Sequence, residues 1–144
     1  MSAESRDEAS SGTVFGGDFR ILRPLASGGM GSVFVAEQLS TGRLRALKLM
    51  QPQLAADPSF RRRFEQEARI GSLIRSDHVV EVIAAGVDAS TEAPWLVMEL
   101  LSGEDLSDYC RKRGPVPPEE TAEILGQLCH GLAAAHDVPI VHRD

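Results

Sequence analysis

Cysteine is scarce in this chain of 144 residues, where only Cys110 and Cys129 occur. Two cysteines are too few for a disulfide framework, and free thiols are typical of a reducing compartment. Neither these cysteines nor any of the four histidines stand at the spacing of a zinc site. We therefore assign no metal site from these residue types.

Long apolar runs are also lacking. No segment approaches the roughly 20 apolar residues that cross a bilayer, and no basic start followed by an apolar stretch marks a secretory signal. These absences predict a cytoplasmic chain without a membrane segment. Basic residues are in the minority, 15 against 21 acidic ones, for a net charge of −6. Such a balance argues against broad nucleic-acid binding.

The order of the expected elements predicts an α+β fold. Residues 1–17 are rich in Ser, Glu, Gly and Asp, so we expect a mobile polar tail. A helix is expected from about Ser59 to Ile74, capped by Asp57 or Ser59. The character of the sequence changes near Leu101, which indicates a lobe boundary. Strands are expected at 18–25, 31–38, 43–50, 79–87 and 94–100, and later helices at 103–114 and 117–137.

A glycine-rich stretch, "LASGGMGSVFV", lies between the first two expected strands. Glycine lets backbone amides approach phosphate oxygens closely. The stretch is followed by the strand-like "VFV", whereas a dinucleotide fingerprint would need a helix there, and a Walker loop would need a lysine and a hydroxyl. Two interpretations stay open, a β-hairpin that covers phosphates and a flexible hairpin tip without a ligand.

Lys48 and Glu67 are predicted to form an ion pair. Strand alternation puts Lys48 on the same face as Ala46, and away from Leu47. Glu67 falls on the apolar stripe of the expected helix, together with Phe64. A carboxylate at that position is costly unless it is paired, and Lys48 is the suitable partner. The alternatives are a lysine bent into solvent and a Glu67 that reaches water at the rim of the stripe.

Five sequence stretches together resemble the eukaryotic-like Ser/Thr protein kinases of bacteria. They are "SGGMGSVFVAE", "ALKLM", "FEQEARI", "WLVMELLSGEDL" and "IVHRD", and they cover about Phe19–Asp144. The resemblance implies a kinase N-lobe over 18–100, with a five-stranded antiparallel sheet and one helix. A hinge and the first helices of an incomplete C-lobe would then occupy 101–144.

The resemblance also implies a set of ATP contacts. Lys48 would hold the α- and β-phosphates, and Glu67 would be its helix partner. Val33 and Ala46 would enclose the adenine. The phosphate-covering loop would consist of Ala26, Ser27, Gly28, Gly29, Met30 and Gly31.

Further roles follow from the same resemblance. Met98 would be the gatekeeper, and backbone groups of Glu99 and Leu101 would bond to the adenine edge. Asp105 would contact the ribose, with Glu104 as the neighbouring candidate. Asp144 would be the catalytic base that accepts the proton of the substrate hydroxyl.

Two positions depart from the family pattern. Ala26 replaces the first loop glycine, and Arg45 replaces the valine of the family's V-A-I-K motif. We expect both changes to be tolerated, because alanine keeps many conformations and Arg45 faces away from Lys48.

Residues 1–144 contain neither the Asn nor the Asp-Phe-Gly motif that holds Mg²⁺ in this family. We therefore expect these residues alone to bind ATP weakly and to be inactive in phosphoryl transfer. A non-catalytic, pseudokinase-like regulatory module is the alternative. The protein substrate is not indicated. An apolar stripe on the last helix, including Leu128 and Leu132, offers a surface for association.

Overall fold

The computed structural model describes residues 11–28 and 31–138. The chain divides into two compact units. The first unit is Met1–Ala68 with Val82–Leu100, and the second is Arg69–Glu81 with Leu101–Asp144.

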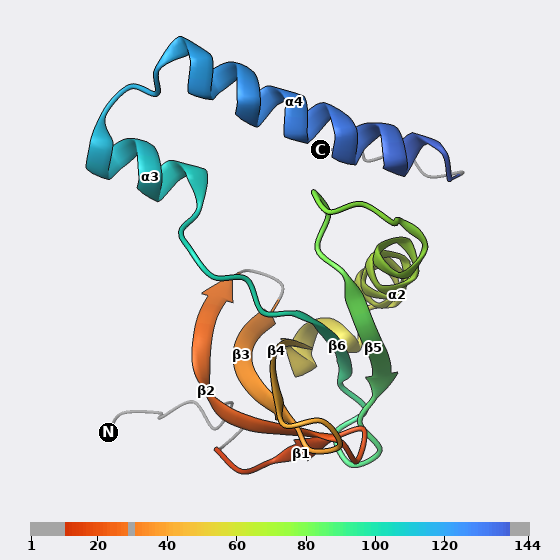
Figure 1. Ribbon diagram of the computed structural model, residues 1–144. Coiled ribbons are helices and arrows are strands. Elements are labelled where there is room, and N and C mark those ends of the chain that lie inside the picture. The colour runs from red at the N-terminus through yellow and green to blue at the C-terminus, as the bar shows by residue number, and fades with distance from the viewer. Residues whose placement is uncertain (1–10, 29–30, 139–144) are drawn as a thin grey trace. The chain divides into compact units, whose positions relative to one another are not determined.

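The first unit contains a six-stranded antiparallel sheet with the order β1-β2-β3-β4-β6-β5 (Figure 1). Helices α1 (Pro52–Ala55) and α2 (Pro58–Leu73) follow β4 in the chain. Two register shifts in the β2–β3 pairing mark bulges, which bend β2. The strands are β1 (Val14–Phe15), β2 (Phe19–Gly28), β3 (Gly31–Gln38), β4 (Arg43–Met50), β5 (Val82–Val87) and β6 (Pro94–Glu99).

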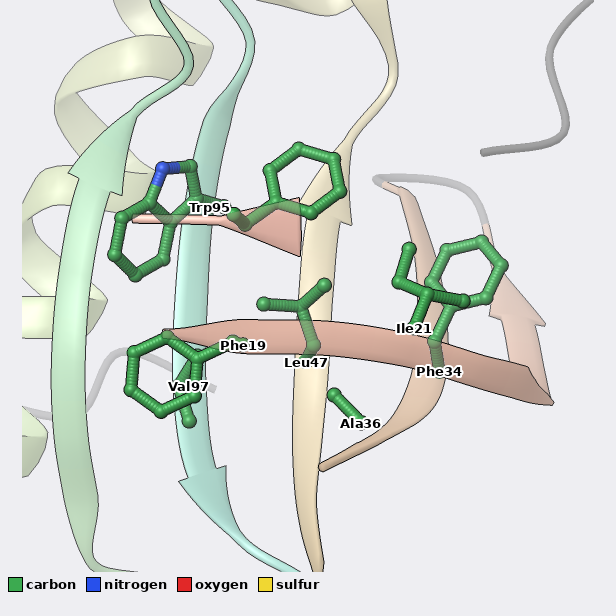
Figure 2. Close-up of a cluster of buried hydrophobic side chains, with 8 residues drawn as sticks. Phe19, Ile21, Phe34, Ala36, Leu47, Trp95 and Val97 are labelled. Carbon is green, nitrogen blue, oxygen red and sulfur yellow. The ribbon is translucent and has the colours of Figure 1, made fainter. Parts of the chain in front are cut away.

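Each face of the sheet supports its own hydrophobic cluster. Leu47 on β4 is fully buried in the larger cluster, which we call the rear core (Figure 2). Met50 on β4 lies in a second cluster with Phe64 of α2 and Leu96 of β6. The odd–even separation of Leu47 and Met50 confirms the predicted alternation along this strand. The rear core consists of Phe15, Phe19, Ile21, Phe34, Ala36, Leu47, Trp95 and Val97.

Strand β1 corrects the prediction for the start of the chain. The mobile polar tail expected over residues 1–17 is wrong for residues 11–17, which the structure describes. Val14 pairs with Arg20 and Phe15 with Phe19, and the Phe15 side chain is 6% exposed. The composition around Phe15 is polar, but one aromatic side chain suffices to anchor a short strand on an existing core. Residues 1–10 lie outside the described residues.

The second unit contains helices α3 (Leu106–Arg113) and α4 (Pro118–His136). The second unit also includes residues 69–81. The sequence analysis expected these residues in the N-lobe, which it placed at 18–100. The reason is local packing, because a Cβ atom on buried Gly131 of α4 would lie 3.2 Å from the His78 carbonyl oxygen and from Val79. The imidazole rings of His78 and His130 stack with centroids 5.7 Å apart.

Helix α3 ends as the sequence predicts. Gly114 follows it with φ of 84°, a left-handed conformation that glycine adopts without strain, and its amide bonds to the Cys110 carbonyl. On α4, Leu125, Leu128 and Leu132 are exposed. Within the described residues, no helix combines the length and the apolar character that a membrane span requires.

Candidate functional site

The central strands place four of the predicted site residues on one face of the sheet. Lys48 on β4 is the register partner of Val33 on β3 and of Leu96 on β6. Two residues earlier, Ala46 is paired with Val35 and with Met98. Side chains of directly paired residues point to the same side of a sheet. Hence Val33, Ala46, Lys48 and Met98 share the front face, opposite the rear core.

The predicted ion pair between Lys48 and Glu67 is present. Lys48 Nζ donates to Glu67 Oε1 at 2.8 Å and to Oε2 at 3.0 Å, which joins β4 to α2. The Lys48 side chain is 18% exposed and that of Glu67 is 47% exposed. The predicted contact between Lys48 and Glu67 is therefore present. Glu67 nevertheless lies at the edge of the apolar stripe and reaches water, which was the alternative interpretation of this residue. An ion pair this open to water contributes about 1 kcal/mol or less to stability, so its main effect is to orient the ammonium group.

Helix α2 is positioned by a cap and by one buried ring. Asp57 Oδ1 accepts the Ser59 amide at 2.8 Å, and Pro58 is the first helical residue. This settles the open choice of cap in favour of Asp57. The Ser59 amide also holds the pKa of the Asp57 carboxyl below its ordinary value. Phe64 is buried on the sheet, and Glu67 stands one turn later on the same side of the helix.

The glycine-rich stretch forms a hairpin between two strands, as predicted. Gly28 at the end of β2 pairs with Gly31 at the start of β3, and Ala26 pairs with Val33. A strand therefore follows the glycines, whereas a dinucleotide fingerprint would continue into a helix. Gly29 and Met30 lie outside the described residues.

The two described glycines of the hairpin differ in their surroundings. A Cβ atom at Gly31 would lie 2.0 Å from the carbonyl oxygen of Leu49, whereas one at Gly28 would meet nothing within 4 Å. Only glycine lets β3 approach β4 so closely at that point. Ala26 does not have a positive φ, since Glu92 is the one non-glycine residue with this conformation in the described part of the chain. Its replacement of the first loop glycine therefore causes no backbone strain.

Arg45, the second departure from the family pattern, lies beside the end of β6. Its backbone pairs with that of Glu99, the last residue of β6. Its Nε and Nη2 atoms each donate to Gln38 Oε1 at 3.1 Å. Gln38 Nε2 in turn donates to Asp18 Oδ2 at 3.2 Å, and Asp18 also accepts the amide and hydroxyl of Ser40. Arg45 thus joins a polar network that ties the start of β2 to the β3–β4 turn.

Three predicted contacts belong to the second unit or to its border. Leu101 is 64% exposed. Asp105 caps α3, since its Oδ1 accepts the Asp108 amide at 2.7 Å. Glu104 accepts from Lys112, and Arg113 lies 3.8 Å from its Oε1 atom. The cap occupies one oxygen of Asp105, whereas both oxygens of Glu104 have cationic partners. Asp144 lies outside the described residues.

One further candidate was missed in the sequence. Leu25 sits in the bulge of β2 between Pro24 and Ala26, directly before the glycine hairpin, and is 47% exposed. A large apolar side chain exposed next to the site residues suits contact with a flat aromatic ligand. The sequence could have indicated Leu25 as a site residue, because it directly precedes the glycine-rich stretch.

Comparison with known proteins places these features in a family. Residues 19–144 match the protein kinase domain family. The chain is 44% identical over 131 residues to the serine/threonine-protein kinase pkn2 of Myxococcus xanthus, and 38% identical over 143 residues to the serine/threonine-protein kinase PknE of Mycobacterium tuberculosis. These matches cover 91% and 99% of this chain but only 15% and 24% of the relatives.

A solved structure gives the same result for the fold. The crystal structure of the PknI kinase domain of Mycobacterium tuberculosis matches with a TM-score of 0.81 at 29% identity. The match covers 95% of this chain and 56% of that one. The kinase-like α+β fold expected from the sequence is thereby confirmed, with β1 and α1 as additions to the five strands and one helix.

Proposed function

Because the chain belongs to the protein kinase family, as part of a bacterial Ser/Thr protein kinase domain, we propose that its first unit binds ATP on the front face of the sheet. The observation that carries this proposal is the ion pair between Lys48 and Glu67, on the same face as Val33 and Ala46. An oriented ammonium group beside small and branched apolar side chains suits a ligand with an anionic and an aromatic end.

The phosphate end of ATP would be held by two kinds of donor. Lys48 supplies a positive charge for the α- and β-phosphates, and Glu67 keeps this charge in place through both carboxylate oxygens. The loop of Ala26, Ser27 and Gly28, continuing through Gly29 and Met30 to Gly31, would cover the phosphates with backbone amides.

The adenine would lie against the apolar part of the front face. Val33 and Ala46 would contact the two sides of the ring, with Leu25 beside Val33 and Met98 as the gatekeeper. The Glu99 carbonyl and backbone groups of Leu101 would bond to the adenine edge. Asp105 is the better ribose contact of the two acidic candidates, because Glu104 is engaged by Lys112 and Arg113.

Phosphoryl transfer to a Ser or Thr hydroxyl is the reaction we propose for the complete kinase domain, with Asp144 accepting the proton. The family uses Mg²⁺, but the described residues do not fit it. Among residues 11–28 and 31–138, no group of three or more His, Cys, Asp and Glu side chains could hold a metal ion. We derive no step through the metal, and we propose that residues 1–144 alone bind nucleotide without transferring phosphate.

Two further proposals concern the setting of the domain. The free thiols of Cys110 and Cys129 suit a reducing, cytoplasmic location.

The exposed leucines of α4, Leu125, Leu128 and Leu132, would form a contact surface. Size-exclusion chromatography with light scattering tests this surface. We expect the parent chain to associate as its concentration rises, and Leu128→Glu to reduce this association. Association unchanged in this variant would exclude the leucine face.

The front-face proposal is tested by methyl-labelled NMR with a non-hydrolysable ATP analogue. Signals of Val33, Ala46 and Met98 should shift on titration. Rear-core signals of Leu47 and Val97 serve as the internal control and should move much less. Equal shifts on both faces, or shifts confined to the rear core, would overturn the proposed site. No shift anywhere would favour a regulatory module without nucleotide.

A further inference from the structure

Residues 11–17 precede the part of the chain that matches the kinase family, which begins at residue 19. They are nevertheless part of the first unit. We call this segment the strap. It is joined to β2 by main-chain bonds, from the Gly12 amide to the Ile21 carbonyl at 2.8 Å and from the Ile21 amide to the Thr13 carbonyl at 2.9 Å. The Ser11 hydroxyl adds a bond to the Leu22 carbonyl at 3.1 Å.

The strap closes one side of the rear core. Phe15 is 6% exposed and lies in the same cluster as Leu47, Trp95 and Val97. Figure 2 shows the Trp95 ring beside the labelled side chains of this cluster. Trp95 is the one tryptophan of the chain, so its emission reports on this contact.

Two glycines make room for the Trp95 ring. A Cβ atom at Gly16, in the strap, would lie 2.7 Å from Trp95 Cη2, and one at Gly86 on β5 would lie 2.5 Å from Trp95 Cζ2. Gly16 has a φ of 56° and Gly17 one of 72°, so both adopt the left-handed conformation. Of the two strap glycines, only Gly16 lies against the indole, since a Cβ atom at Gly17 would meet nothing within 4 Å.

The strap is held more weakly than the strands it covers. Its strand β1 has only two residues, Val14 and Phe15. Phe15 is buried, whereas Val14 is 41% exposed. Short edge elements with few buried side chains open locally while the rest of a domain stays folded. Detachment would uncover Trp95 and free the Ile21 amide.

We propose that the strap is a detachable support which, when docked through Phe15 and Gly16, fixes β4 and β6 for nucleotide binding. Leu47 precedes Lys48 on β4, and Trp95 and Val97 flank Leu96, the register partner of Lys48. Packed cores transmit displacements because they contain few voids. Loss of support behind Leu47 and Trp95 therefore displaces the front-face side chains. The link to nucleotide rests on the proposed function, whereas docking of the strap does not.

Two matched pairs of variants test the strap in the 144-residue chain. Phe15→Ala and Gly16→Ala should shift Trp95 emission to longer wavelength and weaken binding of a non-hydrolysable ATP analogue several-fold. Val14→Ala changes the same segment without touching the core and should keep the parent emission and affinity. Gly17→Ala adds only the strain of a left-handed alanine, which Gly16→Ala shares, so its effect on emission and affinity should be clearly smaller than that of Gly16→Ala. Equal behaviour within each pair would overturn the proposal. A shift in Trp95 emission with unchanged affinity for the analogue would support docking of the strap through Phe15 and Gly16, but it would contradict the coupling of this docking to nucleotide binding.

Hydrogen exchange on the parent chain keeps the test independent of any folding defect. The Ile21 amide should exchange faster than amides in the β3–β4 pairing, because the strap opens without global unfolding. Saturating ATP analogue should slow Ile21 exchange, since coupling between two sites is reciprocal. Ile21 exchange as slow as that of β3 and β4 would show that the strap does not detach. If the analogue does not bind at all, the proposed function fails, while the exchange of Ile21 still decides whether the strap opens.

Discussion

A Cβ atom at Gly31 would lie 2.0 Å from the carbonyl oxygen of Leu49, well inside any tolerable contact. The oxygen belongs to the backbone of β4, next to Lys48, and cannot rotate away as a flexible side chain would. Gly31 therefore has a structural role in addition to its proposed role near phosphates. It allows the first residue of β3 to lie against the strand that carries the lysine.

The two glycines of the hairpin should respond differently to the same substitution. We expect Gly31→Ala to destabilise the fold by about 1–3 kcal/mol, the usual cost of an overpacked contact. Gly28→Ala meets open space and should change the free energy of unfolding by less than about 1 kcal/mol. Urea unfolding of both variants provides the measurement. Equal losses of stability would mean that the close approach of β3 to β4 is not real.

The Glu67→Gln variant tests whether Glu67 mainly orients the Lys48 ammonium group or mainly stabilises the fold. Because the Glu67 side chain is 47% exposed, its charge should contribute about 1 kcal/mol or less to the free energy of unfolding. Nucleotide affinity should fall by about tenfold, equivalent to about 1.4 kcal/mol, because the Lys48 ammonium loses its fixed partner. Glu65→Gln, on the same helix but off the stripe, is the matched control and should bind like the parent chain. An unchanged affinity in Glu67→Gln would contradict the orienting role.

Arg45→Val restores the residue that is usual in the family. We expect a loss of about 1 kcal/mol in stability, because Gln38 loses two hydrogen bonds from the guanidinium group. Affinity for an ATP analogue should stay unchanged, since Arg45 alternates with Lys48 and its side chain lies on the other face of β4. Thermal unfolding and an analogue titration on the same sample check both parts. A large loss of affinity would show that Arg45 positions the hinge.

Asp88 should make the β5–β6 turn sensitive to acid. The Ser90 hydroxyl, followed by the Thr91 amide and hydroxyl, lowers the pKa of Asp88 from 3.8 to about 2. A depressed pKa contributes stability that is fully present above pH 3.8 and is lost as the pH falls through about 2. The stability difference between the parent chain and Asp88→Asn should therefore be constant above about pH 4 and shrink below it.

Urea unfolding at a series of pH values measures this difference. Ser90→Ala with Thr91→Ala removes the hydroxyl donors and should reduce the pH dependence while keeping the carboxylate. A difference that does not change between pH 4 and 2 would exclude Asp88 as the acid-sensitive group.

Much of the fold could be predicted because its signals are local. Strand alternation placed Lys48 and Leu47 on opposite faces, and the helical stripe placed Glu67 next to the sheet. Both patterns depend only on the period of the element. The hairpin at Gly28 and Gly31 followed from the strand-like residues on either side of the glycines.

The features that were missed depend on contacts between distant residues. Strand β1 was not expected, because its only strong signal is Phe15 in a polar segment, and its burial requires Trp95 from β6. The close contact of Gly31 with Leu49 likewise cannot be seen in either strand alone. The exposure of Glu67 depends on how deeply α2 packs on the sheet, which helical periodicity does not determine.

The most direct test of the account is a titration with a non-hydrolysable ATP analogue that compares the only two lysines of the chain, Lys48 and Lys112. Both lysines pair with a glutamate, Lys48 with Glu67 on the front face and Lys112 with Glu104 beside α3. We predict that Lys48→Met binds the analogue at least about tenfold more weakly, while Lys112→Met binds like the parent chain. Parent-like binding by Lys48→Met, or an equal loss in both variants, would contradict the assignment of Lys48 as the phosphate-binding residue.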